Sequence, residues 1–178
     1  MTYFSIRGTC KNVSTEELRC MLQASATVLE LHGKQLSNMR RHDGKIIVKL
    51  VDKKRLGKTR ISKRQCTGRA YRRSQRILLG EWLGFSDLFT VVVHEMMHLY
   101  IEFPEDNSEN LTCKLTAKLK PSIARVYNGL IEGYYRRAAF FAHTKISYPK
   151  EGPDSYDDIQ WTSVELSETG KKYRKVKE

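Results

Sequence analysis

The chain has 178 residues, of which 40% are hydrophobic and 29% are charged, and it carries a formal net charge of +12. This composition is typical of a globular domain, and no apolar run approaches the length needed to span a bilayer. The N-terminus lacks the basic-then-apolar form of a signal peptide, and the cysteines form no Cys-x-x-Cys pair, which predicts a cytoplasmic protein with reduced thiols.

The first half of the chain predicts two strands with a helix between them. Tyr3–Ile6 is a candidate short strand. Ser14 and Glu17 have the spacing of a capping box, and apolar residues follow at helical spacing as far as Leu36. After a turn, Lys45–Val51 is rich in β-branched residues, which favours a strand.

Residues 53–76 contain eleven lysines and arginines and no acidic residue. Such a segment attracts phosphate backbones, and this predicts nucleic acid as a partner. The candidate contacts are Lys63, Arg64, Arg69, Arg72 and Arg73. The alternative is a solvated loop whose charge aids solubility. The segment has a single aromatic residue, which argues against a base-stacking platform.

Two further strands and a buried helix are predicted next. The strands are Thr67–Tyr71 and Arg76–Leu79. Ser86 is a suitable N-cap for the helix, and Pro104 is expected to end it. The sequence between them is apolar almost all round a helical projection, which predicts a central position in the core.

This helix contains the pattern His-Glu-x-x-His at residues 94–98. Residues four apart lie nearly above one another in a helix, so His94 and His98 can bind one Zn²⁺. Glu95 lies about 100° round the helix, from where it can reach a metal-bound water as a general base. The alternative is a pair of ordinary core histidines, but burying three such groups without a partner is costly.

The order of elements from about Arg60 to about Leu119, with its His-Glu-x-x-His helix, resembles the zincin metallopeptidases. It is similar to the compact kind, the SprT-like proteins and small phage-encoded metallopeptidases, and the chain's size fits a phage or bacterial source. The resemblance implies a Zn²⁺ cofactor, a peptide or protein substrate and Glu95 as the catalytic residue. It also implies that an extended substrate pairs with the edge of a strand, for which Arg76–Leu79 is the candidate.

The third metal ligand departs from the SprT-like pattern, because no third histidine follows before His143. Glu109 is the first candidate, on a helix after Pro104, with Glu105 second and Asp106 third. Glu109 shares a helical arc with small residues that allow close approach to the motif helix. The spacing from Asp106 to Glu109 also fits a capping box, in which Glu109 would serve only the backbone. Glu102 is rejected because three ligands along one straight helix converge poorly on a tetrahedral ion.

A separate C-terminal helix is predicted from Pro121 to about His143. Tyr134 and His143 on this helix are candidates for stabilising an oxyanion, although such residues are more often half-buried side chains with a polar tip.

Together these patterns predict an α+β domain over residues 1–148, followed by a loop and a basic tail over residues 149–178. The expected fold is zincin-like, with a small mixed or antiparallel sheet beside a helical core and the His-Glu-x-x-His helix central. The expected function is a zinc-dependent metallopeptidase without a membrane partner. Two alternatives stay open: a DNA-associated SprT-like protease, and a non-enzymatic basic nucleic-acid-binding protein with a structural His/Glu site.

Overall fold

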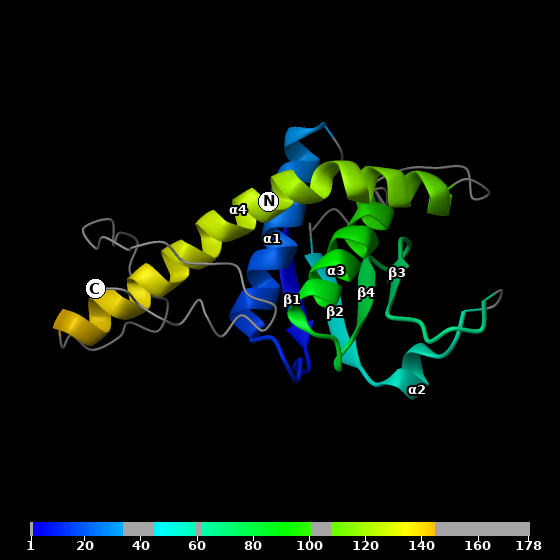
Figure 1. The fold of residues 1–178 in the computed structure, drawn as a ribbon, viewed down its shortest axis with the longest axis horizontal. Helices are drawn as coiled ribbons and strands as arrows, with labels where there is room; N and C mark the ends of the chain where they lie inside the picture. The colour runs from blue at the N-terminus through cyan, green and yellow to red at the C-terminus, as the bar shows by residue number, and fades with distance from the viewer. Residues whose placement is uncertain (1, 34–44, 60–61, 101–107, 145–178) are drawn as a thin grey trace.

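The structure, a computed structural model, describes residues 2–33, 45–59, 62–100 and 108–144 (Figure 1). Its elements in chain order are β1 (Tyr3–Arg7), α1 (Thr15–Leu31), β2 (Lys45–Val51), α2 (Lys53–Leu56), β3 (Gly68–Tyr71), β4 (Arg76–Gly80), α3 (Phe85–Tyr100) and α4 (Ser108–Thr144). The predicted tail over residues 149–178 lies outside the described residues.

The four described strands form one mixed sheet in the order β1-β2-β4-β3. β1 and β2 are parallel, β2 and β4 are parallel, and β3 is antiparallel to β4. Val48 lies at the centre, opposite Ile6 on one side and Ile77 on the other. The predicted α+β class with a small mixed sheet is therefore confirmed. β2 has the predicted bounds, and each other strand differs by one residue at one end.

The two faces of the sheet are covered by different helices, because successive side chains of a strand point to opposite faces. Val48 and Ile77 belong to the main core, into which α1 and α3 pack (Figure 1). Val51 and Leu78 form a smaller buried cluster with Leu56 of α2. No pattern in the sequence predicts α2, a single turn within the basic segment. Asp52 is its N-cap, and the Asp52 side chain accepts a hydrogen bond from the backbone N–H of Arg55.

Helix α1 begins as its capping box predicts. The Ser14 hydroxyl accepts a hydrogen bond from the backbone N–H of Glu17 (3.1 Å), and Glu17 accepts one from the backbone N–H of Ser14 (3.2 Å). The described helix ends at Leu31, and the predicted continuation to Leu36 lies outside the described residues.

Helix α3 is the central element of the core, as predicted, but its predicted N-cap was wrong. The helix begins at Phe85, and the carbonyl of Gly84 accepts the first helical bond from the N–H of Leu88 (2.9 Å). Ser86 therefore lies inside the first turn. The helix packs against α1, α4, β3 and β4. The predicted end at Pro104 lies outside the described residues, and the described helix extends to Tyr100.

Helix α4 is one continuous helix of 37 residues, so the prediction of a new helix at Pro121 was wrong. Pro121 lies on the exposed face, while Ile123, Tyr127 and Ile131 are buried on the opposite face. That burial offsets the helical hydrogen bond that a proline cannot make. In Figure 1 the helix crosses the ends of α1 and α3 and continues beyond them. None of the helices within the described ranges is both long and apolar enough to cross a membrane.

The capping geometry predicts different effects for two serines that look alike in the sequence. Ser14→Ala removes a cap and should lower the free energy of unfolding by about 1 kcal/mol. Ser86→Ala should change it by less than about 0.5 kcal/mol, because Ser86 is exposed and does not cap α3. Chemical denaturation of both variants measures the difference, and equal losses would contradict the helix start at Phe85.

Candidate metal centre

The two histidines of the motif lie on the less buried stripe of α3. Val91, His94 and His98 are half-buried, while Val92, Val93, Met96 and Met97 are buried around them. The imidazole rings of His94 and His98 have centroids 4.8 Å apart, and their Nε2 atoms are 3.1 Å apart. Helical spacing therefore places both nitrogens at the same point outside α3, as the motif predicts.

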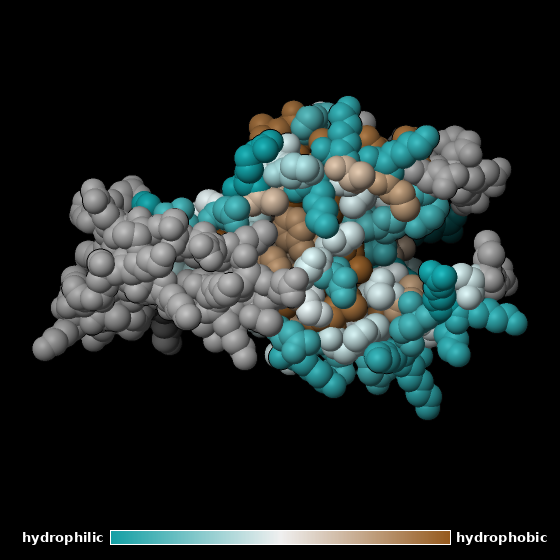
Figure 2. Space-filling view, in the orientation of Figure 1, coloured by the Kyte–Doolittle hydropathy of each residue, from teal (hydrophilic) through white to brown (hydrophobic). Residues whose placement is uncertain are grey.

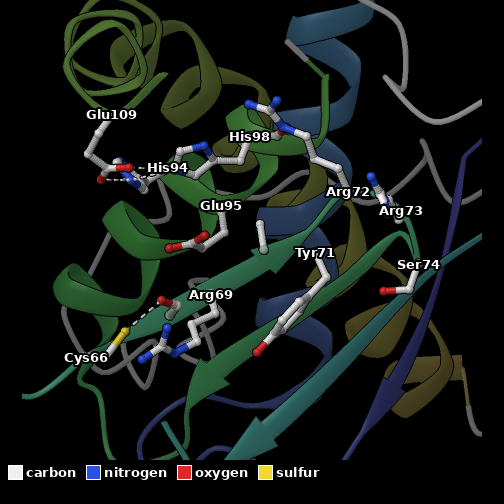
Figure 3. A pocket seen from close by; sticks show the side chains of 12 residues that line it. Cys66, Arg69, Tyr71, Arg72, Arg73, Ser74, His94, Glu95, His98 and Glu109 are labelled. Carbon is white, nitrogen blue, oxygen red and sulfur yellow. Dashed lines mark hydrogen bonds and ion pairs between the residues drawn. The ribbon is translucent and has the colours of Figure 1, made fainter. Parts of the chain in front are cut away.

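Glu109, in the first turn of α4, reaches the same point from a second helix (Figure 3). Its Oε1 atom is 2.9 Å from the Nε2 atom of His94, and its Oε2 atom is 3.1 Å from the Nε2 atom of His98. The Glu109 side chain is 70% exposed, so burial does not hold it there. Two nitrogens and a carboxylate thus converge from α3 and α4.

Hydrogen bonds alone satisfy this arrangement poorly. If both Nε2 atoms carry hydrogens toward Glu109, those hydrogens face each other across the 3.1 Å between the rings. If either Nε2 atom lacks a hydrogen, its lone pair faces the Glu109 carboxylate. A cation would satisfy all three contacts. Zn²⁺ with tetrahedral ligands at about 2.0–2.1 Å separates its ligand atoms by about 3.4 Å, only a few tenths of an ångström more than these distances.

The electrostatics of His98 also suit a metal ligand. Burial, and then the neighbouring His94, lower the pKa of His98 below its ordinary value. A histidine binds a metal as the neutral imidazole. The site therefore favours the form of His98 that binds a cation.

Glu95 lies beside the histidines but is buried, with 7% of its surface exposed. Its carboxylate faces the cavity below the two imidazoles (Figure 3). Burial and the charge of Glu109 raise the pKa of Glu95 to about 8, and Arg69 opposes the shift. The carboxyl group is thus separated from the converging ligands and is available to hold or move a proton.

Strand β3 approaches Glu95 closely because residue 68 is glycine. A Cβ atom at Gly68 would lie 2.5 Å from Cγ1 of Val91, 3.0 Å from Cγ of Glu95 and 3.1 Å from Oε1 of Glu95. Any larger residue at this position would push α3 and β3 apart. Gly68 therefore positions the sheet edge against the carboxylate.

These groups line a cavity of about 690 Å³ between β3, α3 and the start of α4 (Figure 3). The remaining lining residues come from β3 and the segments that flank it: Cys66, Arg69, Ala70, Tyr71, Arg72, Arg73 and Ser74. The cavity is thus bordered by a sheet edge on one side and by the His/Glu cluster on the other.

Cys113 is a candidate ligand that the sequence analysis missed. It lies one turn after Glu109 on α4, and its Sγ atom is within 4.8 Å of ligand atoms of both His94 and Glu109. Burial and the charge of Glu109 raise the pKa of this exposed thiol. The four-residue spacing from Glu109 was the available signal, because it places both side chains on one face of a helix.

Not all of the proposed nucleic-acid contacts lie at the cavity. Arg69, Arg72 and Arg73 line the cavity, whereas Lys63 and Arg64 are exposed on the loop between α2 and β3. That loop is closed by hydrogen bonds from the N–H of Thr59 to Arg64 and from the N–H of Lys63 to Thr59. The alternative ligands Glu105 and Asp106, and the rejected Glu102, lie outside the described residues.

The two oxyanion candidates are not brought to this cavity. Tyr134 lies about seven turns after Glu109 on α4, roughly 37 Å along a straight helix, and its ring packs against Tyr135. His143 is further still along the same helix. The prediction placed both residues on a separate helix from Pro121, and the continuous helix instead extends them away from Glu109.

The strand expected to pair with a substrate also needs correction. β4 (Arg76–Gly80) is hydrogen-bonded on both sides, to β2 and to β3, so it has no open edge. The edge beside the cavity belongs to β3. Strand order depends on long-range pairing, which the local sequence pattern does not show.

Comparisons with family models, with curated proteins and with solved structures find no match to this chain.

The close contact at Gly68 gives a prediction about the site. Gly68→Ala should lower the free energy of unfolding by about 1–3 kcal/mol, because the added methyl group overlaps Val91 and Glu95. Gly129→Ala is the matched control: it lies in the interior of α4, and its added Cβ would meet no atom within 4 Å beyond the local helix backbone, so stability should rise by about 0.5–1 kcal/mol. Denaturant unfolding of both variants measures these changes. A neutral Gly68→Ala would contradict the close packing of β3 on α3.

Proposed function

We propose that the protein is a zinc-dependent metallopeptidase. The observation that carries this proposal is the convergence of His94 Nε2, His98 Nε2 and the Glu109 carboxylate within 2.9–3.1 Å of one another, with a buried carboxyl group beside them. Two histidines and one carboxylate are a ligand set of catalytic zinc sites, which keep a fourth position for water or substrate. The resemblance of the motif to zincins supports the same chemistry.

In this proposal the zinc ligands are His94, His98 and Glu109. Bound zinc supplies Lewis acidity to the scissile carbonyl and lowers the pKa of a coordinated water. Glu95 accepts a proton from the attacking water and delivers it to the leaving amine. The buried position of Glu95 suits this role because a carboxyl group with a raised pKa can both accept and return a proton near neutral pH.

The substrate is an extended peptide, and strand β3 is its proposed docking edge. β3 borders the cavity, and its unpaired edge within the described sheet offers backbone groups for pairing with another strand. This replaces β4, which has no open edge. The cytoplasm is the proposed compartment, in keeping with four cysteines that form no disulfide within the described residues.

A DNA-associated peptidase is the first alternative. It would use the basic segment 53–76, whose side chains contribute to the hydrophilic surface over α2 and the approach to β3 (Figure 2). A structural metal site in a non-enzymatic protein is the second, and one observation favours it. Cys113 lies close enough to His94 and Glu109 to supply a fourth protein ligand. Four protein ligands would leave no position for water.

The first test measures zinc content and peptide cleavage on the same preparations. Wild type should bind about one zinc per chain and cleave a randomised peptide library, and Glu95→Gln should keep the zinc while losing roughly 10²–10⁴-fold in cleavage rate. His98→Ala and Glu109→Ala should lose the zinc. Glu16→Ala, a glutamate in the first turn of α1, is the matched control for Glu109 and should keep it.

In this test a different outcome contradicts each part of the proposal. Wild type without zinc, even after zinc is supplied, would remove the metallopeptidase. Cleavage by Glu95→Gln at the wild-type rate would remove the general base. Zinc retained by Glu109→Ala would remove Glu109 as the third ligand.

A second test separates an open site from a closed one. Replacing zinc by Co²⁺ should produce no thiolate-to-cobalt charge-transfer absorption in wild type, and Cys113→Ser should keep both the metal and the cleavage rate. The reason is that a thiol must lose its proton to bind a metal, and burial and the charge of Glu109 raise the pKa of the Cys113 thiol and oppose this loss. A charge-transfer band that disappears in Cys113→Ser would establish a four-ligand structural site instead.

A further inference from the structure

Arg72 links the edge of the sheet to a candidate zinc ligand. Its Nε atom donates to the main-chain carbonyl oxygen of His98 at 2.8 Å, and both residues line the cavity. In Figure 3 the Arg72 side chain reaches from the end of β3 toward His98. His98 lies in the last turn of the described α3, where a cationic donor to a carbonyl oxygen is favourable. The contact therefore acts on the main chain of the ligand and not on its imidazole.

The hairpin turn after β3 holds Arg72 in this position. Arg72 is the first residue between β3 and β4, and its carbonyl oxygen accepts a hydrogen bond from the N–H of Gln75 at 3.2 Å. Gln75 is buried, has a left-handed φ of 48°, and its own carbonyl oxygen accepts from the N–H of Ile47 in β2 at 3.0 Å. The pair Tyr71 and Arg76 closes the hairpin. A donor on a turn that is fixed in this way loses little conformational entropy when it holds the helix.

The same end of α3 is held from another side by α1. The Tyr100 hydroxyl lies 3.0 Å from the Thr2 hydroxyl and 3.1 Å from the Glu30 carboxylate. Tyr100 is two residues after His98, so their side chains point to different sides of the helix. His94, by contrast, has described helical turns on both sides of it. Of the two histidines, His98 therefore depends more on contacts from outside the helix.

Arg69 makes the same kind of contact elsewhere and provides a comparison within the cavity. Its Nε and Nη2 atoms donate to the carbonyl oxygen of Leu56 at 3.1 and 3.0 Å, and it also lines the cavity. Leu56 belongs to α2, which supplies no candidate ligand. Of these two arginines, only Arg72 contacts the main chain of a ligand. Charge alone predicts that removal of either one strengthens cation binding, because a guanidinium repels a cation.

We propose that Arg72 is a positioning residue of the metal centre, which fixes the main chain at His98 and so sets where the second imidazole meets the cation. This inference rests on the metal site of the proposed function and adds the turn between β3 and β4 to that site. The hydrogen bond and not the charge carries the effect. Without the bond the last turn of α3 is free to shift, and a site whose ligands are less well oriented binds its metal more weakly.

The test compares two variants at position 72 that differ in one hydrogen-bond donor. A glutamine has an amide nitrogen on Cδ, at the place of the arginine Nε atom, whereas a methionine has a methyl group there, and both lack the charge. Arg72→Met should weaken zinc binding by roughly tenfold, measured by competition with a chelating dye, while Arg72→Gln should stay within about threefold of wild type. Arg69→Met is the matched control and should not weaken zinc binding, because the bond that it loses goes to Leu56. Arg72→Ala, which also lacks the donor, replaces Arg72→Met if that variant does not fold.

Two further measurements separate positioning from a purely structural role. The unfolding temperature of the zinc-free protein should fall in both Arg72→Met and Arg69→Met, since each loses a bond to a carbonyl. The visible spectrum of the Co²⁺-loaded protein, which reports ligand geometry, should change in Arg72→Met alone.

The outcomes distinguish this inference from the proposed function. Equal zinc affinity in Arg72→Met and Arg72→Gln, or equal weakening in Arg69→Met, would overturn the positioning role and leave the metallopeptidase intact. Zinc binding that weakens only in Arg72→Met, in a protein that cleaves no peptide, would keep the positioning role and remove the peptidase. Wild type that binds no zinc would remove both.

Discussion

The close packing of α3 within the core is the constraint on which the site depends. The helix is covered by α1, α4, β3 and β4, so a single stripe that contains His94 and His98 remains open to the cavity. Gly68 lets β3 approach this stripe closely enough to cover Glu95. At the C-terminal end of the helix, the Tyr100 hydroxyl donates to the Glu30 carboxylate at 3.1 Å and fixes α3 against α1. The direction of the two imidazoles is therefore set by the core and not by the site itself.

The position of Glu109 has a different origin, because its exposed side chain has little local support. It lies in the first turn of α4, and the later turns of that helix are anchored in the core. Tyr127 packs against Phe85 and Phe89 of α3, with ring centroids 5.6 and 5.7 Å apart. Closer to the site, Lys120 Nζ donates to the Thr90 hydroxyl at 2.6 Å. These contacts hold α4 against α3 and so place the first turn of α4, with Glu109, beside the two histidines.

The parts of this architecture that depend on local periodicity could be predicted from the sequence, and the parts that depend on long-range packing could not. The strand over Lys45–Val51, the capping box at Ser14 and the shared face of His94 and His98 are short-range features, and all three appear in the structure. Pro121 is a strong local signal for a helix start, but burial on the opposite face of α4 outweighs it. The same continuous helix removes Tyr134 from the cavity. The open edge at β3 follows from the strand order of the sheet, and the local sequence pattern does not encode that order.

The protonation of Glu95 is coupled electrostatically to the candidate metal ligands. A general base must be ionised when it accepts a proton, and burial together with the nearby charge of Glu109 raises the pKa of Glu95 to about 8. Arg69 opposes that shift, and a divalent cation among His94, His98 and Glu109 would oppose it more strongly because of its double charge. Cation binding and ionisation of Glu95 are therefore coupled, so binding should release protons. The proton affinity of Glu95 would therefore depend on whether a cation is bound among His94, His98 and Glu109, and burial strengthens this dependence because it weakens screening by water.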